Sequence, residues 1–267
     1  MNNRLASLAV LLSFAVVPAA LADNLGGIQR AEFERPQSQS DWRVTLGAGA
    51  MAQPEYEGAD EYEVTPLPFV DVTYKDRVRL NFEGLNVKVI NQENFNAGVG
   101  VGLDFGREDD DGDRLRGLGD IDPTAEGRLF AEYKVGQASA KVAFAQDLGD
   151  GHDGYTIDAD AGYGFVMRNT GTFVRPSVGA TFAGENYMES YFGVSAAQSV
   201  RSGLSQYDSD AGFKDINAGV FVTQKLNENW SVNGLARFSQ LLGDAADSPI
   251  VEDESQLQTG LFVAYTF

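Results

Sequence analysis

The sequence predicts an all-β protein, a transmembrane antiparallel β-barrel of the bacterial outer membrane. Three observations carry this prediction. Apolar and polar residues alternate with period two from about residue 41 to the end, in runs of about ten residues, the length that a tilted strand needs to cross the hydrocarbon layer. Short and long connections alternate between these runs, and aromatic residues recur at the short-turn ends, as in outer-membrane barrels.

The first 40 residues precede the barrel. Arg4 supplies a positive start, residues 5–17 an apolar core, and Ala20-Leu21-Ala22 a small-residue cleavage site. We therefore expect residues 1–22 to be a signal peptide and the mature chain to begin at Asp23. Residues 23–40 are expected to form a polar periplasmic tail, and residues 41–267 the barrel. No later stretch is long and apolar enough for a transmembrane helix.

The alternation predicts twelve strands. In residues 155–167 the odd positions are mostly apolar and the even ones mostly polar, and residues 124–135 repeat the pattern. The predicted strands are 41–51, 64–74, 77–83, 85–91, 95–106, 124–135, 137–147, 155–167, 172–183, 212–225, 230–241 and 256–267.

Two features of this assignment are open. Residues 77–91 fit one strand equally well, which would leave an odd count of eleven; a division at Glu83-Gly84 restores the even count of twelve. A barrel of ten strands is the alternative. Pro66, Pro68 and Pro176 each remove a ladder donor, and a closed barrel has no free edge to accommodate them.

A soluble β-sandwich would also alternate, with its apolar face in a core. The aromatic residues favour the barrel, because a sandwich does not require them to gather at one end of the strands. The residues expected in this interfacial girdle are Trp42, Tyr74, Phe95, Tyr133, Phe173, Trp230 and Phe267.

Charge is concentrated in the long connections. The chain carries 39 acidic and 20 basic residues, for a net charge of −19. Residues 52–63, 107–123, 148–154, 184–211 and 242–255 hold 23 of the acids and 4 of the bases. We expect these acidic loops outside the cell and the short turns in the periplasm. The polar strand faces carry both signs, which can pair across the lumen and leave a narrow or occluded interior.

Composition excludes several function classes. Net negative charge disfavours nucleic acid as a partner. The chain has no cysteine and one histidine, so thiolate and multi-histidine metal sites are impossible, and we predict no cofactor and no metal. The twelve-stranded outer-membrane phospholipases carry a serine two residues after their histidine, whereas His152 is followed there by Gly154. We therefore predict that the protein is not an enzyme.

Two loop segments have recognisable local chemistry. The acidic run Glu108-Asp109-Asp110-Asp111-Gly112-Asp113 does not fit an EF-hand, because Arg107 and Leu118 would occupy the first and twelfth positions. A solvated acidic loop is the simpler interpretation, and a looser divalent-ion site that bridges to lipopolysaccharide phosphates is the alternative. Residues 195–203 predict a short helix with Ser195 as N-cap and Gly203 after its end.

The loops also resemble a known family. The segments Tyr191-Phe192-Gly193-Val194, Arg201-Ser202-Gly203-Leu204, Gly151-His152-Asp153-Gly154 and Pro54-Glu55-Tyr56-Glu57-Gly58, with residues 113–120 and 243–251, are similar to those of the MipA/OmpV family of outer-membrane proteins. The resemblance spans roughly residues 41–267. It implies localisation in the outer membrane of a Gram-negative bacterium and a non-catalytic scaffold that binds a lytic murein transglycosylase and a bifunctional penicillin-binding protein.

A scaffold needs residues that reach the periplasm. Residues 23–40 combine mixed charge with one aromatic residue, a composition that suits a segment that folds on binding. The candidate partner-binding residues are Arg30, Phe33 and Arg35. The alternative functions are a narrow cation-favouring channel and a surface receptor or adhesin with an acidic extracellular rim, in contact with outer-membrane lipid and lipopolysaccharide.

Overall fold

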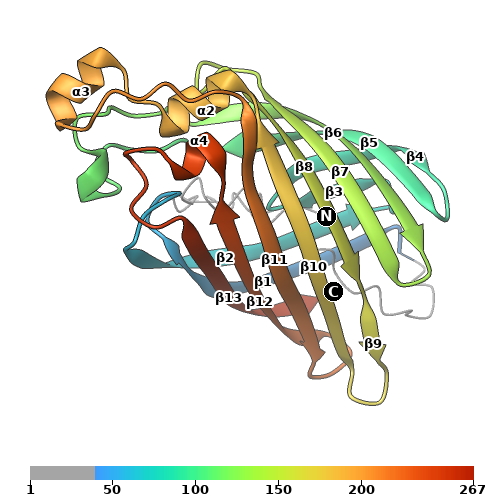
Figure 1. The fold of residues 1–267 in the computed structure, drawn as a ribbon. Coiled ribbons are helices and arrows are strands. Elements are labelled where there is room, and N and C mark those ends of the chain that lie inside the picture. Colours follow the sequence, from blue (N-terminus) through green and yellow to red (C-terminus); the bar gives the residue numbers. More distant parts are fainter. Residues whose placement is uncertain (1–39) are drawn as a thin grey trace, which may run out of the picture.

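A computed structural model describes residues 40–267 and shows a closed antiparallel barrel (Figure 1). β1 pairs with β2 on one side and with β13 on the other, which joins the last strand to the first. Each remaining strand is antiparallel to its neighbours. The strands are β1 Trp42–Pro54, β2 Tyr62–Tyr74, β3 Val78–Asn81, β4 Gly84–Asn91, β5 Phe95–Asp104, β6 Thr124–Val135, β7 Ala138–Asp147, β8 Tyr155–Tyr163, β9 Phe165–Met167, β10 Thr172–Ala183, β11 Gly212–Lys225, β12 Trp230–Leu241 and β13 Ser255–Thr266.

The twelve-strand prediction is confirmed, because β8 and β9 are two parts of one strand in the wall. Both pair with the same edge of β10, and they are separated only by Gly164. A Cβ at Gly164 would lie 2.9 Å from the Phe173 ring, so a glycine lets that ring approach the backbone. Residues 155–167 therefore bend instead of forming one regular strand.

The predicted division of residues 77–91 is also confirmed. β3 and β4 form a hairpin whose last pair is Asn81↔Gly84. Gly84 has a φ of +105°, and a Cβ there would collide with the carbonyl oxygen of Val101. Only glycine fits this tight turn, which explains how two short strands replace one.

The three prolines lie where pairing is interrupted. β10 pairs with β9 up to Val174 and with β8 from Ser177, so Pro176 falls in the gap between them. Pro66 and Pro68 lie on a part of β2 whose second edge pairs with no strand in residues 40–267. These positions lose no ladder bond when the N–H is absent.

The side chains alternate as predicted. In β6, Glu126 and Glu132 are buried inside, while Leu129 and Tyr133 are 56% and 54% exposed on the outer wall. The apolar face therefore points outward and the polar face lines the interior, as expected for a barrel in lipid.

The aromatic girdle is confirmed except at one position. The Trp42 and Tyr74 rings lie 4.6 Å apart, and Trp230 packs edge-on against Tyr265. The prediction for Phe173 was wrong. Its side chain is 7% exposed and points inward, where it fills the space beside Gly164.

The connections differ sharply at the two ends. At the short-turn end, Lys75 and Asp76 form a tight turn with φ of 49° and 52°. At the long-loop end lie η1 Asp113–Leu115, α2 Glu185–Phe192, α3 Ala196–Ser202 and α4 Gly243–Ala246. Within residues 40–267, no helix has the length and apolarity needed to cross a bilayer.

Candidate functional site

The long loops form one packed layer over the mouth of the barrel, which we call the cap (residues 55–61, 105–123, 148–154, 184–211 and 242–254). Figure 1 shows its helices α2, α3 and α4 gathered at this end. α2 turns one apolar face inward, because its buried residues Tyr187, Met188, Tyr191 and Phe192 recur at helical spacing. They pack with Ile121, Ala183, Leu241 and Ala245 in a core of their own.

A second apolar cluster joins the loop at residues 55–61 to three other loops of the cap. Tyr56, Leu115, Leu118, Val194 and Ile250 are almost fully buried together. Burial of apolar side chains on this scale stabilises the cap as a small core.

Buried hydrogen bonds cross-link the loops. The Arg107 guanidinium donates to the Tyr191 carbonyl at 2.7 Å, and the Ser248 hydroxyl donates to the Phe192 carbonyl at 2.6 Å. The Tyr56 hydroxyl donates to Glu252 at 2.8 Å. Burial first, and then this carboxylate, raise the pKa of Tyr56, so the phenol stays protonated.

The predicted short helix is confirmed as α3. The Ser195 hydroxyl accepts from the Gln198 N–H, and the Gln198 side chain accepts from the Ser195 N–H, so the two form a capping box. Gly203 ends the helix with a φ of 80°. The Gln198 amide also donates to the Leu118 carbonyl at 2.8 Å, which attaches α3 to the neighbouring loop.

His152 lies beneath the cap with its side chain fully buried. The Gly154 N–H donates to His152 Nδ1 at 3.0 Å. Nε2 faces two carboxylates, 3.6 Å from Asp104 Oδ2 and 3.9 Å from Glu126 Oε1. The ring packs edge-on against Tyr187 at 4.9 Å. Burial lowers the pKa of His152, but Glu126, Asp104 and Asp147 outweigh it, and the pKa lies above its usual value.

This geometry gives His152 a structural role. Because Nδ1 accepts a hydrogen bond, the neutral ring carries its proton on Nε2 and directs an N–H, not a lone pair, at Asp104 and Glu126. The three side chains are close enough to surround an ion, but this tautomer does not offer the histidine as a ligand. A Cβ at Gly154 would collide with the Tyr187 backbone, so a serine does not fit at this position.

The acidic run is an exposed part of the cap. The Glu108 N–H donates to Asp111 Oδ2 and the Asp109 N–H to Asp120 Oδ1, both at 2.8 Å. Repulsion from Asp111 and Asp110 raises the pKa of Glu108. These carboxylates order their own loop by accepting backbone hydrogen bonds, which fits the simpler interpretation of the sequence.

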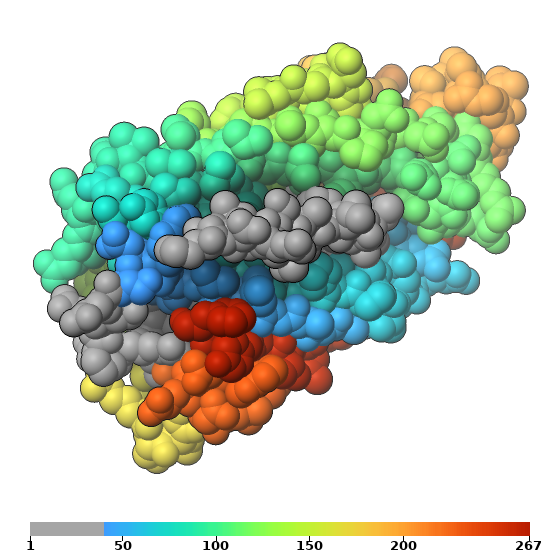
Figure 2. All heavy atoms as spheres, turned by 180° about the vertical axis from the view of Figure 1, so that it is seen from behind, coloured from blue at the N-terminus to red at the C-terminus, as the bar shows by residue number. Residues whose placement is uncertain are grey.

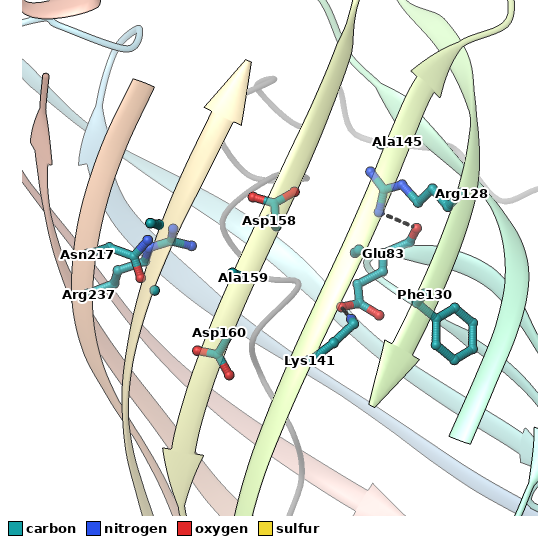
Figure 3. A pocket seen from close by; sticks show the side chains of 13 residues that line it. Glu83, Arg128, Phe130, Lys141, Ala145, Asp158, Ala159, Asp160, Asn217 and Arg237 are labelled. Carbon is teal, nitrogen blue, oxygen red and sulfur yellow. Dashed lines mark hydrogen bonds and ion pairs between the residues drawn. The ribbon is translucent and has the colours of Figure 1, made fainter. Parts of the chain in front are cut away.

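Below the cap, the polar strand faces and the β3–β4 turn pair their charges inside the lumen, and Figure 3 shows Glu83, Lys141 and Arg128 close together. Lys141 bonds to Glu83 Oε1 at 2.6 Å, and Arg128 bonds to Glu126 Oε2 at 2.6 Å and to the Glu83 carbonyl at 2.9 Å. Asp160 pairs with Arg175. Glu83 belongs to the β3–β4 turn, so this turn is drawn into the lumen by β6 and β7.

One cavity in the lumen is small. It has a volume of about 80 Å³ and lies between Glu83, Arg128, Lys141, Asp158, Asp160 and Arg237, together with other residues of the same walls. Since one water needs roughly 10–15 Å³ of such volume, this cavity holds about five to eight water molecules. The prediction of paired charges is confirmed among residues 40–267, and the narrow or occluded interior stays a prediction.

The predicted partner-binding residues Arg30, Phe33 and Arg35 lie outside the described residues, as do the predicted signal peptide and most of the tail. The sequence analysis missed the apolar core of the cap and the contacts that Glu83 makes in the lumen. The helical spacing of Tyr187, Met188, Tyr191 and Phe192 was a visible signal for the core of the cap. No local pattern marks a contact such as Glu83–Lys141, which joins residues 58 positions apart.

Comparisons with known proteins identify relatives. The family model "MltA-interacting protein MipA" matches residues 46–267. The chain is 24% identical over 190 residues to the outer membrane protein Omp26La of Vibrio anguillarum, covering 71% of each chain. It is 30% identical over 153 residues to the MltA-interacting protein of Escherichia coli, covering 56% of this chain and 59% of that protein. Among solved structures, a KdgM porin aligns over 84% of this chain and 99% of its own, with 11% identity and a TM-score of 0.41.

Proposed function

This chain belongs to the MltA-interacting protein MipA family, and from that membership we propose that it is a non-catalytic scaffold of the outer membrane. Its partners on the periplasmic side would be a lytic murein transglycosylase and a bifunctional penicillin-binding protein. The name of the Escherichia coli relative supports the first partner.

The single observation that carries the proposal is the closed interior. A packed cap covers the long-loop end, and paired charges fill the lumen below it. Such a barrel is suited to anchor a binding surface in the membrane, and the cavity between Glu83, Lys141 and Arg237 has a volume of only about 80 Å³.

The proposed binding surface lies at the short-turn end. Outer-membrane barrels place their short turns in the periplasm, where murein enzymes are found. Residues 23–40 precede β1 at the same end and include Arg30, Phe33 and Arg35. A charged segment with one aromatic residue can fold against a partner, with the ring buried and the arginines paired to carboxylates.

The test is capture of a purified lytic murein transglycosylase by the full mature barrel in lipid nanodiscs. The Arg30→Glu, Phe33→Ala, Arg35→Glu variant should lose at least tenfold in affinity, since an aromatic anchor and two charge contacts are removed. A matched control neutralises Asp109, Asp110 and Asp111 to Asn at the opposite end.

Two results would count against the scaffold. One is full capture by the tail variant together with full capture by variants of the short turns. The other is loss of capture by the Asp-to-Asn control, which would place the partner on the cap instead.

A second candidate function is a surface receptor that gathers cationic ligands, and the acidic loops favour it. Their 23 acids and 4 bases make the outer rim strongly negative. Oligolysine should then bind with an affinity that falls steeply as the salt concentration rises from about 50 to about 200 mM, because salt screens the ion pairs between its ammonium groups and the acidic loops. Replacement of Asp109, Asp110, Asp111 and Asp113 by asparagine should weaken that binding. An affinity that changes neither with salt nor with these substitutions would exclude the acidic rim as the binding site.

A further inference from the structure

Within residues 40–267, no strand pairing joins β2 to β5 in the half of the wall nearer the cap. β2 pairs with β1 along its whole length, from Trp42↔Tyr74 to Pro54↔Tyr62. Its other edge pairs with β3 only from Tyr74↔Val78 to Val72↔Leu80. We call this interruption the seam. The strands on its two sides are the blue β1 and β2 and the teal β3–β5 of Figure 2.

The opposite border of the seam is β5. It pairs with β6 up to Asp104↔Thr124, but β4 reaches only to Leu85↔Val101. The β3–β4 hairpin therefore closes the wall near the short turns and ends at mid-height. The Glu83 contacts with Lys141 and Arg128 hold the tip of the hairpin inside the lumen.

The edge of β2 at the seam is built to remain without a strand partner. The Tyr74 carbonyl accepts from the Arg77 N–H, so its backbone groups face β3. Alternate residues of a strand direct their backbone groups to the same side, which places Pro66 and Pro68 with their nitrogens toward the seam. An N–H without a partner costs several kcal/mol in a membrane, and proline has none. The same prolines would deny two donors to any added strand, so a peptide strand is not the expected occupant.

Apolar side chains line the interior face of β2 beside this edge and continue over β1, β13 and β12. Met51, Leu67, Phe69, Phe262 and Ala264 form a buried cluster, with Phe82 and Leu235 packed against it. The Phe82 ring, from the tip of the hairpin, lies 5.8 Å from the Phe69 ring and 6.4 Å from the Phe262 ring. The lumen of a membrane barrel is otherwise polar, and apolar side chains there need a separate reason.

An apolar surface also borders the seam on the outside. Val64 of β2 is 70% exposed, and Val101 and Leu103 of β5 are 50% and 54% exposed. A continuous apolar path thus leads from the lipid-facing wall, past an edge poor in donors, to an aromatic cluster inside. The chemistry that fits this path is a hydrocarbon chain, which needs no hydrogen bonds and is the solvent on the outer side.

We propose that the seam is a lateral opening through which an acyl chain of an outer-leaflet lipid enters the barrel and contacts Phe82 and the cluster behind it. With the cap outside the cell, the upper half of the wall lies in the outer leaflet. An acyl chain in the seam would add apolar contacts to Phe82, which is only partly buried.

The experiment uses the full mature chain in phosphatidylcholine vesicles whose acyl chains carry bromine, a short-range quencher of tryptophan. Trp42 and Trp230 are replaced by Phe, and one new tryptophan is introduced as Phe82→Trp or Phe130→Trp. Phe82 lies five residues after Arg77 and Phe130 five residues before Val135, so their depths match. Phe130 lines the cavity behind complete strands (Figure 3).

We expect the brominated lipid to quench the tryptophan at position 82 at least twofold more than the one at position 130. Equal quenching at the two positions would overturn the proposal. If Phe82→Trp does not insert, a photoreactive benzoylphenylalanine at position 82 should crosslink to lipid and the same group at position 130 should not; crosslinking at neither position refutes lipid entry. Quenching at 82 that occurs only after deletion of residues 23–40 would also overturn it, because the chain's own tail would then occupy the seam.

Discussion

An arginine at Val263 tests the placement of the barrel wall in lipid. Val263 is 45% exposed on the outer face of β13, and it is four residues from Phe267 at the girdle. With a rise of about 3.4 Å per residue and a tilt of about 40°, it lies roughly 10 Å from the short-turn interface, near the middle of an apolar band about 25 Å tall.

The expected cost follows from this depth. An arginine on the lipid face near the midplane costs about 2–4 kcal/mol, and near an interface about 0–1 kcal/mol. Leu257 offers a matched control, because it is 46% exposed on the same face but ten residues from Phe267, or roughly 26 Å. Val263→Arg should therefore reduce the folding equilibrium constant by about 30-fold to 1,000-fold, and Leu257→Arg by about fivefold at most.

The assay is equilibrium unfolding in urea with the barrel folded into phospholipid vesicles. Val263→Ala, measured alongside, separates the loss of the valine from the cost of the charge. The inward neighbours Phe262 and Ala264 are unsuitable controls, since both are fully packed at 2% and 0% exposure. Equal costs at Val263 and Leu257 would show that the strand does not cross the membrane at the depth inferred.

Three further predictions concern the lumen, the cap and the orientation. Glu83→Gln leaves Lys141 without its carboxylate partner, which should destabilise the barrel by about 1–3 kcal/mol in urea unfolding, whereas Glu83→Gln with Lys141→Met should recover most of that loss. Protonation of His152 breaks the Gly154 N–H bond to Nδ1, but attraction to the nearby carboxylates outweighs this loss, because the folded-state pKa is raised. The charged form therefore stabilises the cap fully below about pH 6.5, and this contribution is lost as pH rises through the raised value. Hydrogen exchange of residues 148–154, corrected for intrinsic rates, should show that trend in the native chain and none in His152→Gln. Trypsin added to intact cells should cut at exposed Arg116, if it cuts at all. Cleavage at Arg116 only in permeabilised cells would show that the long loops face the periplasm.

The period-two pattern predicted the barrel well, because in a membrane wall burial depends on parity alone. Seven strands, such as Thr124–Val135, match the predicted bounds to within a residue, and Glu126 and Leu129 take the sides that the pattern assigns. Local chemistry also predicted α3, since a capping box and a left-handed glycine act within a few residues.

Features that depend on distant contacts were not predictable in this way. Phe173 follows the aromatic pattern, but a glycine at position 164 gives its ring an inward site. Pro66 and Pro68 conflict with a closed ladder until β3 is seen to be too short to reach them. The sequence analysis described the cap as acidic loops because charge dominates its composition, while its stability comes from apolar residues brought together from four separate connections.

The central claim is that this barrel is a closed membrane anchor, and single-channel recording in planar bilayers tests it most directly. The packed cap and the Glu83–Lys141 and Arg128–Glu126 pairs leave a cavity of about 80 Å³ in the lumen, so the mature protein should insert without a resolvable current above that of the bare bilayer. A stable, cation-selective conductance that rises in steps with the amount of inserted protein would contradict the account and favour a channel.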